Sequence, residues 1–232
     1  MIIKICGLRR EADIEAANEV RPDLVGFVFA KKSPRYVPPE QAEKLREMLS
    51  PGIRTAGVFT DEKPENIAAL LGAGVIDFAQ LHGFAFSGAA EGPAESAESR
   101  TDRISREILA LKAMTDRPVI RAYRIETAQD IEEANNSPAD RILLDHGAGG
   151  TGDRFDWSLL QGMKRPFILA GGLDPDNVRE AIRAAGPMLC GVDVSSGVET
   201  DGYKDPEKMR RFVEAVQAGI SGRDRAGDRK EV

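Results

Sequence analysis

Residues 166–196 read PFILAGGLDPDNVREAIRAAGPMLCGVDVSS and contain the unit from which the chain is built. Two apolar runs, PFILAGG from Pro166 and LCGVDVSS from Leu189, flank a segment in which apolar residues recur at helical spacing. Each run is apolar at consecutive positions, which is typical of strands covered on both faces and therefore of a parallel sheet. The stretch predicts a strand, a helix and a second strand of an α/β protein.

The same unit recurs along the chain. Apolar runs also start at residues 2, 24, 53, 75, 118 and 141, and successive starts lie 22, 29, 22, 43, 23, 25 and 23 residues apart. Helical segments with Pro, Asp or Thr at their starts stand between most of them. Eight right-handed βα units close a barrel. We predict a single (β/α)8 TIM barrel over residues 1–220; the alternative is an open doubly wound sheet, which usually has fewer strands.

Two polar segments depart from this repeat. The 43-residue interval contains GFAFSGAAEGPAESAESRTDR, from Gly83 to Arg103. It has too little apolar surface to offset the entropy lost on ordering, so we expect an insert around residues 84–103 that forms a mobile surface loop in the fourth βα connection. A lid or partner-binding arm is the alternative. The tail, residues 221–232, is equally polar and is expected to be disordered.

Composition and charge narrow the class of protein. With 32 Lys and Arg against 38 Asp and Glu, the net charge is -6, which disfavours nucleic acid and anionic membranes as partners. The longest apolar stretches, such as residues 24–30, fall short of the ~20 residues of a membrane span. Met1 leads directly into IIKIC without a leader, and the two cysteines lie far apart, so we expect a cytoplasmic protein with reduced thiols.

Polar side chains stand at the ends of five of the eight apolar runs. In a (β/α)8 barrel the reacting groups come from the C-terminal ends of the strands and from the loops after them, so these side chains are expected to meet on one rim. They are Cys6 after the first run, Arg35 after the second, Gln80 and His82 after the fourth, Asp145 after the sixth and Asp193 in the eighth.

Cys6 and Asp145 are the candidates for chemistry. Cys6 precedes Gly7, and as a thiolate it could act as a nucleophile or a base, either of which needs a pKa lowered by nearby positive charge. The alternative is a small buried apolar residue. Asp145 follows three apolar residues, and a buried carboxylate must be paired or change its pKa. The alternative for Asp145 is a helix cap or a salt bridge to Arg121 or Arg141.

Glycine- and serine-rich turns after the seventh and eighth runs predict a phosphate site. In barrels of this kind the loops after these two strands aim backbone N–H groups at phosphate oxygens. The ligand predicted is therefore a phosphorylated small molecule, without a nucleotide fingerprint. No metal site is expected, because His82 and His146 lack a third ligand at a recognisable spacing. The residues expected to bind phosphate are Gly171, Gly172, Ser195, Ser196 and Gly197.

A series of short motifs runs along the chain. In order, they are KICG (4–7), GFVF (26–29), KSPRYV (32–37), AGVF (56–59), QLHG (80–83), LLD (143–145), GGTG (149–152), FDW (155–157), AGGL (170–173), VDVSSGVE (192–199) and GYKD (202–205). Each alone is weak, but together and in this order the motifs are highly specific. The series resembles the phosphoribosylanthranilate isomerase family of tryptophan biosynthesis.

The resemblance implies a reaction and roles for the candidate residues. It implies an Amadori rearrangement of N-(5'-phosphoribosyl)anthranilate to 1-(2-carboxyphenylamino)-1-deoxyribulose 5-phosphate, without a metal or organic cofactor. Asp145 would be the general acid that opens the furanose ring, and Cys6 the general base that removes the C2 proton. Arg35 would pair with the anthranilate carboxylate. The remaining candidates, Gln80, His82 and Asp193, would line the ribose and ring site.

Two other functions stay open at this point. One is a broader sugar-phosphate isomerase that also accepts the related aminoaldose of the histidine pathway. Proteins of that kind use a carboxylate on the first strand where this chain has Cys6, which argues against this function. The other is a non-catalytic barrel that binds a phosphorylated metabolite, against which the presence of both Cys6 and Asp145 argues. The chain is expected to be a monomer or a homodimer.

Overall fold

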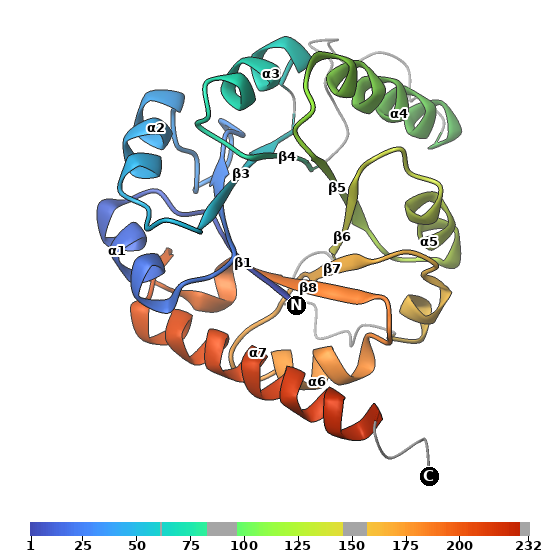
Figure 1. The fold of residues 1–232 in the computed structure, drawn as a ribbon. Coiled ribbons are helices and arrows are strands. Elements are labelled where there is room, and N and C mark those ends of the chain that lie inside the picture. The colour runs from blue at the N-terminus through green and yellow to red at the C-terminus, as the bar shows by residue number, and fades with distance from the viewer. Residues whose placement is uncertain (61, 83–96, 146–156, 228–232) are drawn as a thin grey trace.

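The computed structural model of the protein describes residues 1–60, 62–82, 97–145 and 157–227. Eight parallel strands pair in chain order, and β8 pairs with β1 to close a barrel (Figure 1). This confirms the predicted (β/α)8 barrel and excludes the open sheet. The strands are β1 (Ile2–Cys6), β2 (Leu24–Val28), β3 (Arg54–Phe59), β4 (Phe78–Leu81), β5 (Val119–Arg124), β6 (Arg141–Asp145), β7 (Phe167–Ala170) and β8 (Leu189–Val194).

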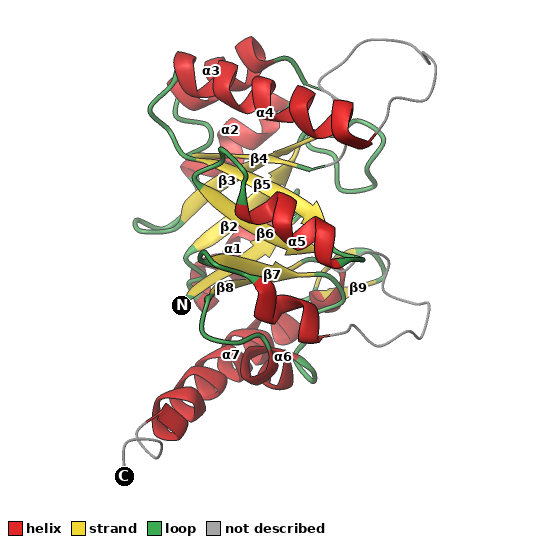
Figure 2. Cartoon of the chain, turned by 90° about the vertical axis from the view of Figure 1, so that its right-hand side faces the viewer, coloured by secondary structure: helices red, strands yellow, loops and turns green. Residues whose placement is uncertain are grey.

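Helices surround the barrel on its outside (Figures 1 and 2). Where the chain passes from β6 to β7, the described part is a 3-10 helix, η1 (Trp157–Gly162). None of the helices in the described ranges has both the length and the apolar character needed to cross a membrane. The α-helices are α1 (Glu11–Val20), α2 (Pro39–Glu47), α3 (Pro64–Gly72), α4 (Ala97–Met114), α5 (Ala128–Asn135), α6 (Val178–Ala184) and α7 (Pro206–Gly227).

The starts of α5 and α1 show that a helix can be capped with or without the Ser, Thr, Asp or Asn that usually marks its start in a sequence. α5 is capped by Thr127, whose hydroxyl accepts a hydrogen bond from the backbone N–H of Asp130. At the start of α1 the capping position is Arg10, which has no side-chain acceptor. Asp13 reaches back instead and accepts hydrogen bonds from the backbone N–H groups of Arg9 and Arg10. The carboxylate of Asp13 therefore satisfies, from within the helix, the two backbone N–H groups that immediately precede α1.

Alternation along the strands separates an outer apolar layer from the barrel interior. On β1, Ile3 and Ile5 pack in the large cluster between the strands and the helices. Lys4 and Cys6 therefore point inward. The interior is filled by a lower cluster, Leu24, Ala56, Phe78, Ile120, Ala122, Leu143, Ile168 and Ala170, and an upper cluster, Cys6, Val28 and Val58.

The structure corrects the predicted extent of the insert. Residues 83–96 lie outside the described residues, but α4 begins at Ala97, so residues 97–103 are helical rather than part of a loop. The packed portion of α4 contains Ile104, Ile108 and Leu111, which are buried. Once these residues fix a helix, each added residue gains a backbone hydrogen bond without needing apolar burial. The Ala and Glu residues of this segment are also good helix formers.

The predicted disordered tail is wrong over residues 221–227 for the same reason. α7 runs to Gly227 and leaves the body of the barrel at its C-terminal end (Figure 2). Its anchored part buries Met209, Phe212 and Val216 against the barrel, and the helix extends beyond them by propagation. Residues 228–232 lie outside the described residues.

Candidate active site

A cavity of about 770 Å³ lies at the C-terminal ends of the barrel strands. The predicted convergence on one rim is therefore confirmed. Gly197 alone among the predicted residues does not line the cavity and stands beside it in the 3-10 helix η2 (Ser196–Val198). The other ten that line it are Cys6, Arg35, Gln80, His82, Asp145, Gly171, Gly172, Asp193, Ser195 and Ser196.

Close backbone packing shapes the turns after β7 and β8. Gly171 and Gly172 have φ angles of +89° and +62°, a left-handed conformation that favours glycine. The side-chain amide of Asn177 donates to the carbonyl of Gly172 at 2.8 Å. A Cβ at Gly197 would lie 1.9 Å from the carbonyl oxygen of Leu173. Only glycine therefore lets the two turns touch.

Gly197→Ala is expected to lower the free energy of unfolding by about 1–3 kcal/mol, because an oxygen of the backbone has to move. The same displacement should weaken the binding of inorganic phosphate, measured by calorimetry. Gly72→Ala is the matched control: its site in α3 has open space, so the substitution should be neutral or stabilise slightly. A Gly197→Ala protein with unchanged stability and phosphate affinity would contradict this account of the turns.

Cys6 lies at the floor of the cavity. Its side chain is buried, and its sulfur packs so closely on Gly26 that a Cβ there would lie 2.6 Å from Sγ. The carbonyl of Cys6 accepts a hydrogen bond from the hydroxyl of Ser195 at 3.0 Å. The backbone of Cys6 is thus tied to the turn after β8, where phosphate binding is predicted.

Lys4 is a residue of the site that the sequence analysis missed. Its ammonium is completely buried and donates to Oδ2 of Asp193 at 2.9 Å. The register of β1 and β8 places these two residues opposite each other. The available signal was a single charged residue inside the apolar run IIKIC, because a buried ammonium requires an anionic partner.

The charges around Cys6 set its pKa in opposite directions. Burial raises the pKa of the thiol, the ammonium of Lys4 lowers it, and the carboxylate of Asp193 raises it; the net change is upward. The positive charge that a thiolate needs is present in Lys4, but desolvation in the barrel interior outweighs its attraction and keeps the pKa of the thiol above its usual value. Burial lowers the pKa of Lys4, but Asp193 and Cys6 together raise it above its usual value. Lys4 therefore remains a cation.

Asp145 lies on the opposite side of the cavity from β1, beside His82. The Nε2 of His82 and the Oδ2 of Asp145 are 3.9 Å apart, and the Asp145 side chain is 26% exposed. The carboxyl is therefore accessible both to solvent and to a ligand in the cavity. In the described part of the chain, no group of three His, Cys, Asp or Glu side chains could hold a metal ion.

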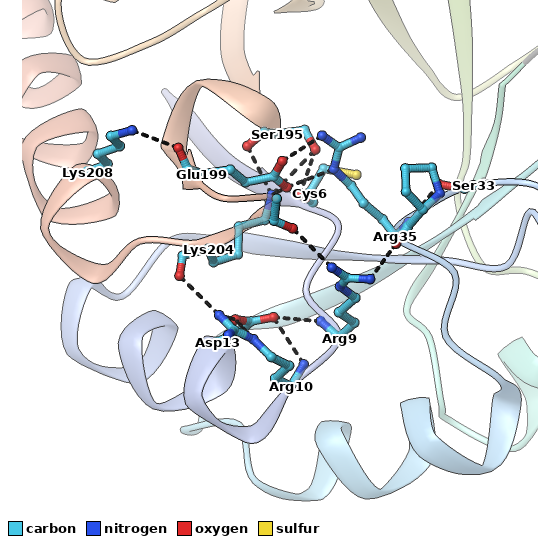
Figure 3. Close-up of polar contacts among 12 residues, drawn as sticks. Cys6, Arg9, Arg10, Asp13, Ser33, Arg35, Ser195, Glu199, Lys204 and Lys208 are labelled. Carbon is cyan, nitrogen blue, oxygen red and sulfur yellow. Dashed lines mark hydrogen bonds and ion pairs between the residues drawn. The ribbon is translucent and has the colours of Figure 1, made fainter.

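Arg35 is held by a glutamate that the sequence analysis also missed. Its Nε and Nη2 donate to Oε1 and Oε2 of Glu199, each at 2.7 Å (Figure 3). The ammonium of Lys204 donates to Oε1 of Glu199 at 2.6 Å and to the carbonyl of Ser195 at 3.0 Å. Burial alone would raise the pKa of Glu199, but the hydrogen bonds from Arg35 and Lys204 lower it to about 2.

Comparison with known proteins identifies the family. The family model described as N-(5'phosphoribosyl)anthranilate (PRA) isomerase matches residues 3–96 and 103–215. The chain belongs to this family. The N-(5'-phosphoribosyl)anthranilate isomerase of Thermoanaerobacter sp. (strain X514) is 42% identical over 221 residues, which cover 93% of this chain and 97% of the relative.

Solved structures of phosphoribosyl anthranilate isomerases share the fold. The enzyme from Thermus thermophilus superposes with a TM-score of 0.74 at 31% identity, covering 94% of this chain and 99% of the other. A second structure, in complex with reduced 1-(o-carboxyphenylamino)-1-deoxyribulose 5-phosphate, has a TM-score of 0.69 at 34% identity and covers 94% and 100%.

The phosphoribosylanthranilate isomerase motifs also contain the residues that the sequence analysis missed. Lys4 stands in KICG, Glu199 ends VDVSSGVE, and Lys204 stands in GYKD. Within these motifs, Lys4 pairs with Asp193, Glu199 accepts from Arg35, and Lys204 donates to the carbonyl of Ser195. The GGTG motif lies outside the described residues.

Proposed function

We propose that the protein catalyses the Amadori rearrangement of N-(5'-phosphoribosyl)anthranilate to 1-(2-carboxyphenylamino)-1-deoxyribulose 5-phosphate, a step of tryptophan biosynthesis. The observation that carries the proposal is one cavity lined by a thiol, a carboxyl, an arginine and two glycine- and serine-rich turns. These groups match the two anionic ends of the substrate and the two proton transfers of the reaction. Family membership supports the same activity.

The ends of the substrate fix its orientation. Its phosphate binds the turns after β7 and β8, where backbone N–H groups of Gly171, Gly172 and Ser196 can donate to the oxygens. Its carboxylate pairs with Arg35, whose planar guanidinium suits that geometry. The ribose then lies between Cys6 and Asp145.

Asp145 and Cys6 each make one proton transfer, and a tautomerisation completes the rearrangement. Asp145 donates a proton to the ring oxygen, the C1–O bond breaks, and the nitrogen lone pair forms a Schiff base at C1. The thiolate of Cys6 then takes the proton from C2, and the electrons of that C–H bond neutralise the iminium to give an enolamine. The enol loses its hydroxyl proton while C1 gains one, which leaves the ketone at C2.

Two buried acceptors are suited to the sugar hydroxyls. In the described part of the chain, Oε1 of Gln80 and Oδ1 of Asp193 are buried and have no hydrogen-bond partner from the protein. A buried acceptor without a partner is costly, so a hydroxyl donor there is favourable. We assign Gln80, His82 and Asp193 to the ribose and ring site.

Both cysteines are free thiols, which supports a cytoplasmic location.

Purified protein is expected to convert N-(5'-phosphoribosyl)anthranilate without added metal. The reaction is followed by the loss of anthranilate-type fluorescence, with circular dichroism as the check on folding. Unchanged fluorescence with folded protein would contradict the proposed function. Binding of the substrate without turnover would identify a non-catalytic barrel, and turnover of the histidine-pathway aminoaldose in a parallel assay would identify the broader isomerase.

A further inference from the structure

The contacts of Arg35 divide its guanidinium into two edges. An arginine side chain has five N–H donors in a planar fork. The edge formed by Nε and Nη2 donates to both carboxylate oxygens of Glu199. The terminal edge, formed by Nη1 and the second proton of Nη2, is therefore the one directed away from Glu199 (Figure 3). Arg35 lines the cavity, so this edge is suited to a second carboxylate.

Glu199 is itself fixed on several sides. Lys204, with a side chain 1% exposed, donates to Oε1 of Glu199 and to the carbonyl of Ser195. Lys208 donates to the backbone carbonyl of Glu199 at 2.7 Å. The carboxylate therefore cannot follow a movement of Arg35 without breaking contacts with the turn after β8.

The hairpin that carries these residues is anchored to the start of α1. The strands β9 (Glu199–Thr200) and β10 (Tyr203–Lys204) form it. The guanidiniums of Arg9 and Arg10 lie 4.6 Å and 4.1 Å from the centre of the Tyr203 ring, and Arg10 also donates to the carbonyl of Lys204. Cation–π contacts of this kind stabilise an exposed aromatic ring.

The stem of Arg35 is restricted as well. A Cβ at Gly7 would lie 2.5 Å from Cδ of Arg35, so the stem lies against the backbone immediately after Cys6. The position of the guanidinium is thus defined at its base by the Cys6–Gly7 turn and at its head by Glu199. The charges of Arg35, Glu199 and Lys204 sum to a single positive charge, which one substrate carboxylate can neutralise.

We propose that Glu199 is a specificity-determining positioning residue, which holds one edge of Arg35 so that the terminal edge receives the carboxylate on the aromatic ring of the substrate. The inference rests on the proposed function and adds to it. Glu199 acts through Arg35 and does not touch the reacting atoms. It selects for a substrate with a carboxylate beside the amine, because only that group completes the pairing of Arg35.

The test compares two substrates that differ only in this carboxylate. N-(5'-phosphoribosyl)anthranilate and N-(5'-phosphoribosyl)aniline are assayed by chromatographic separation of product, with the native protein and with Glu199→Gln. For the carboxylated substrate, Glu199→Gln should raise KM about tenfold or more, the value of a hydrogen bond to a charged group. For the aniline analogue KM should change less than about twofold, since Arg35 has no carboxylate to bind.

Three further variants keep the result interpretable. In an Arg35→Lys background, Glu199→Gln should cause no additional loss of selectivity, because the two residues act as one unit. Glu199→Asp should recover part of the selectivity, and it replaces Glu199→Gln if that variant does not fold. Glu207→Gln is the control, since Glu207 is an exposed glutamate paired with Arg210 on α7, and it should change neither KM.

The outcomes separate the inference from the function. If the native protein does not convert the anthranilate substrate, the proposed function fails. If the native protein is active and Glu199→Gln impairs both substrates equally, or neither, the positioning role of Glu199 is overturned while the function stands. A loss confined to the carboxylated substrate supports the role.

Discussion

Cys6→Ala and Asp145→Asn are each expected to lower kcat by about 10²-fold or more, the contribution typical of a general base or a general acid. KM should change little, because the phosphate and the carboxylate of the substrate bind elsewhere in the cavity. The measurement is steady-state turnover of N-(5'-phosphoribosyl)anthranilate. The double variant should be little worse than either single one, because residues that act in one sequence are not additive.

Cys190→Ser is the matched control for the cysteine, because Cys190 packs beside the lower interior cluster and not in the cavity. Near-normal turnover in Cys6→Ala and Asp145→Asn would remove both from the mechanism. A loss as large in Cys190→Ser would show that the effect of a cysteine substitution is structural.

The pH dependence of turnover tests the same assignment to Cys6. Only the thiolate can accept the C2 proton, and burial raises the thiol pKa, so in an Asp145→Asn background, where the general acid no longer titrates, kcat/KM should rise with pH through neutrality and level off only on the alkaline side. Cys6→Asp replaces the thiol by a carboxyl with a much lower pKa, so its rising limb should move to lower pH. A rising limb at the same pH in both proteins would exclude Cys6 as its source.

The barrel can be predicted from the sequence because each of its strands follows a local pattern of apolar residues. Consecutive apolar residues mark each strand, and the regular spacing of the runs limits how the strands can be connected. The lengths of α4 and α7 were less predictable. The residues of α4 before Ile104 and those of α7 after Val216 are helical because each stretch adjoins a packed segment of the same helix. The composition of a stretch taken by itself does not contain this information.

The residues of the site likewise fall into those that the sequence predicts and those that only the tertiary structure reveals. Cys6 and Asp145 could be found from their positions at strand ends, which is where a barrel holds reacting groups. The role of Lys4 follows only from the pairing of β1 with β8, which places it opposite Asp193. The role of Glu199 follows from its contact with Arg35, which is 164 residues away in sequence. Register and long-range contacts of this kind are tertiary information.

Lys4→Met is expected to lower the free energy of unfolding by about 3–5 kcal/mol, the cost of leaving one charge of a buried ion pair without its partner. The carboxylate of Asp193 is only 8% exposed, and within the described residues its Oδ1 has no other partner to replace the ammonium. Urea unfolding followed by circular dichroism measures the change. Lys112→Met is the control: its ion pair with Asp140 is about one-third exposed, so it should cost no more than about 1 kcal/mol.

The double variant Lys4→Met, Asp193→Leu should recover most of this loss, because it removes both charges and leaves apolar side chains in their place. The pH dependence has a definite sign. The pKa of Lys4 is raised in the folded protein, so its contribution is fully present below about pH 10, the unfolded value, and is lost only as pH rises through the raised pKa. The pKa of Asp193 is raised as well, because desolvation outweighs the attraction of Lys4, and removal of the ammonium raises it further. The deficit of Lys4→Met should therefore grow as pH rises through neutrality and shrink only in strong alkali. A deficit that disappears at neutral pH, or a double variant as unstable as the sum of the singles, would mean that Lys4 and Asp193 do not stabilise each other as a charged pair.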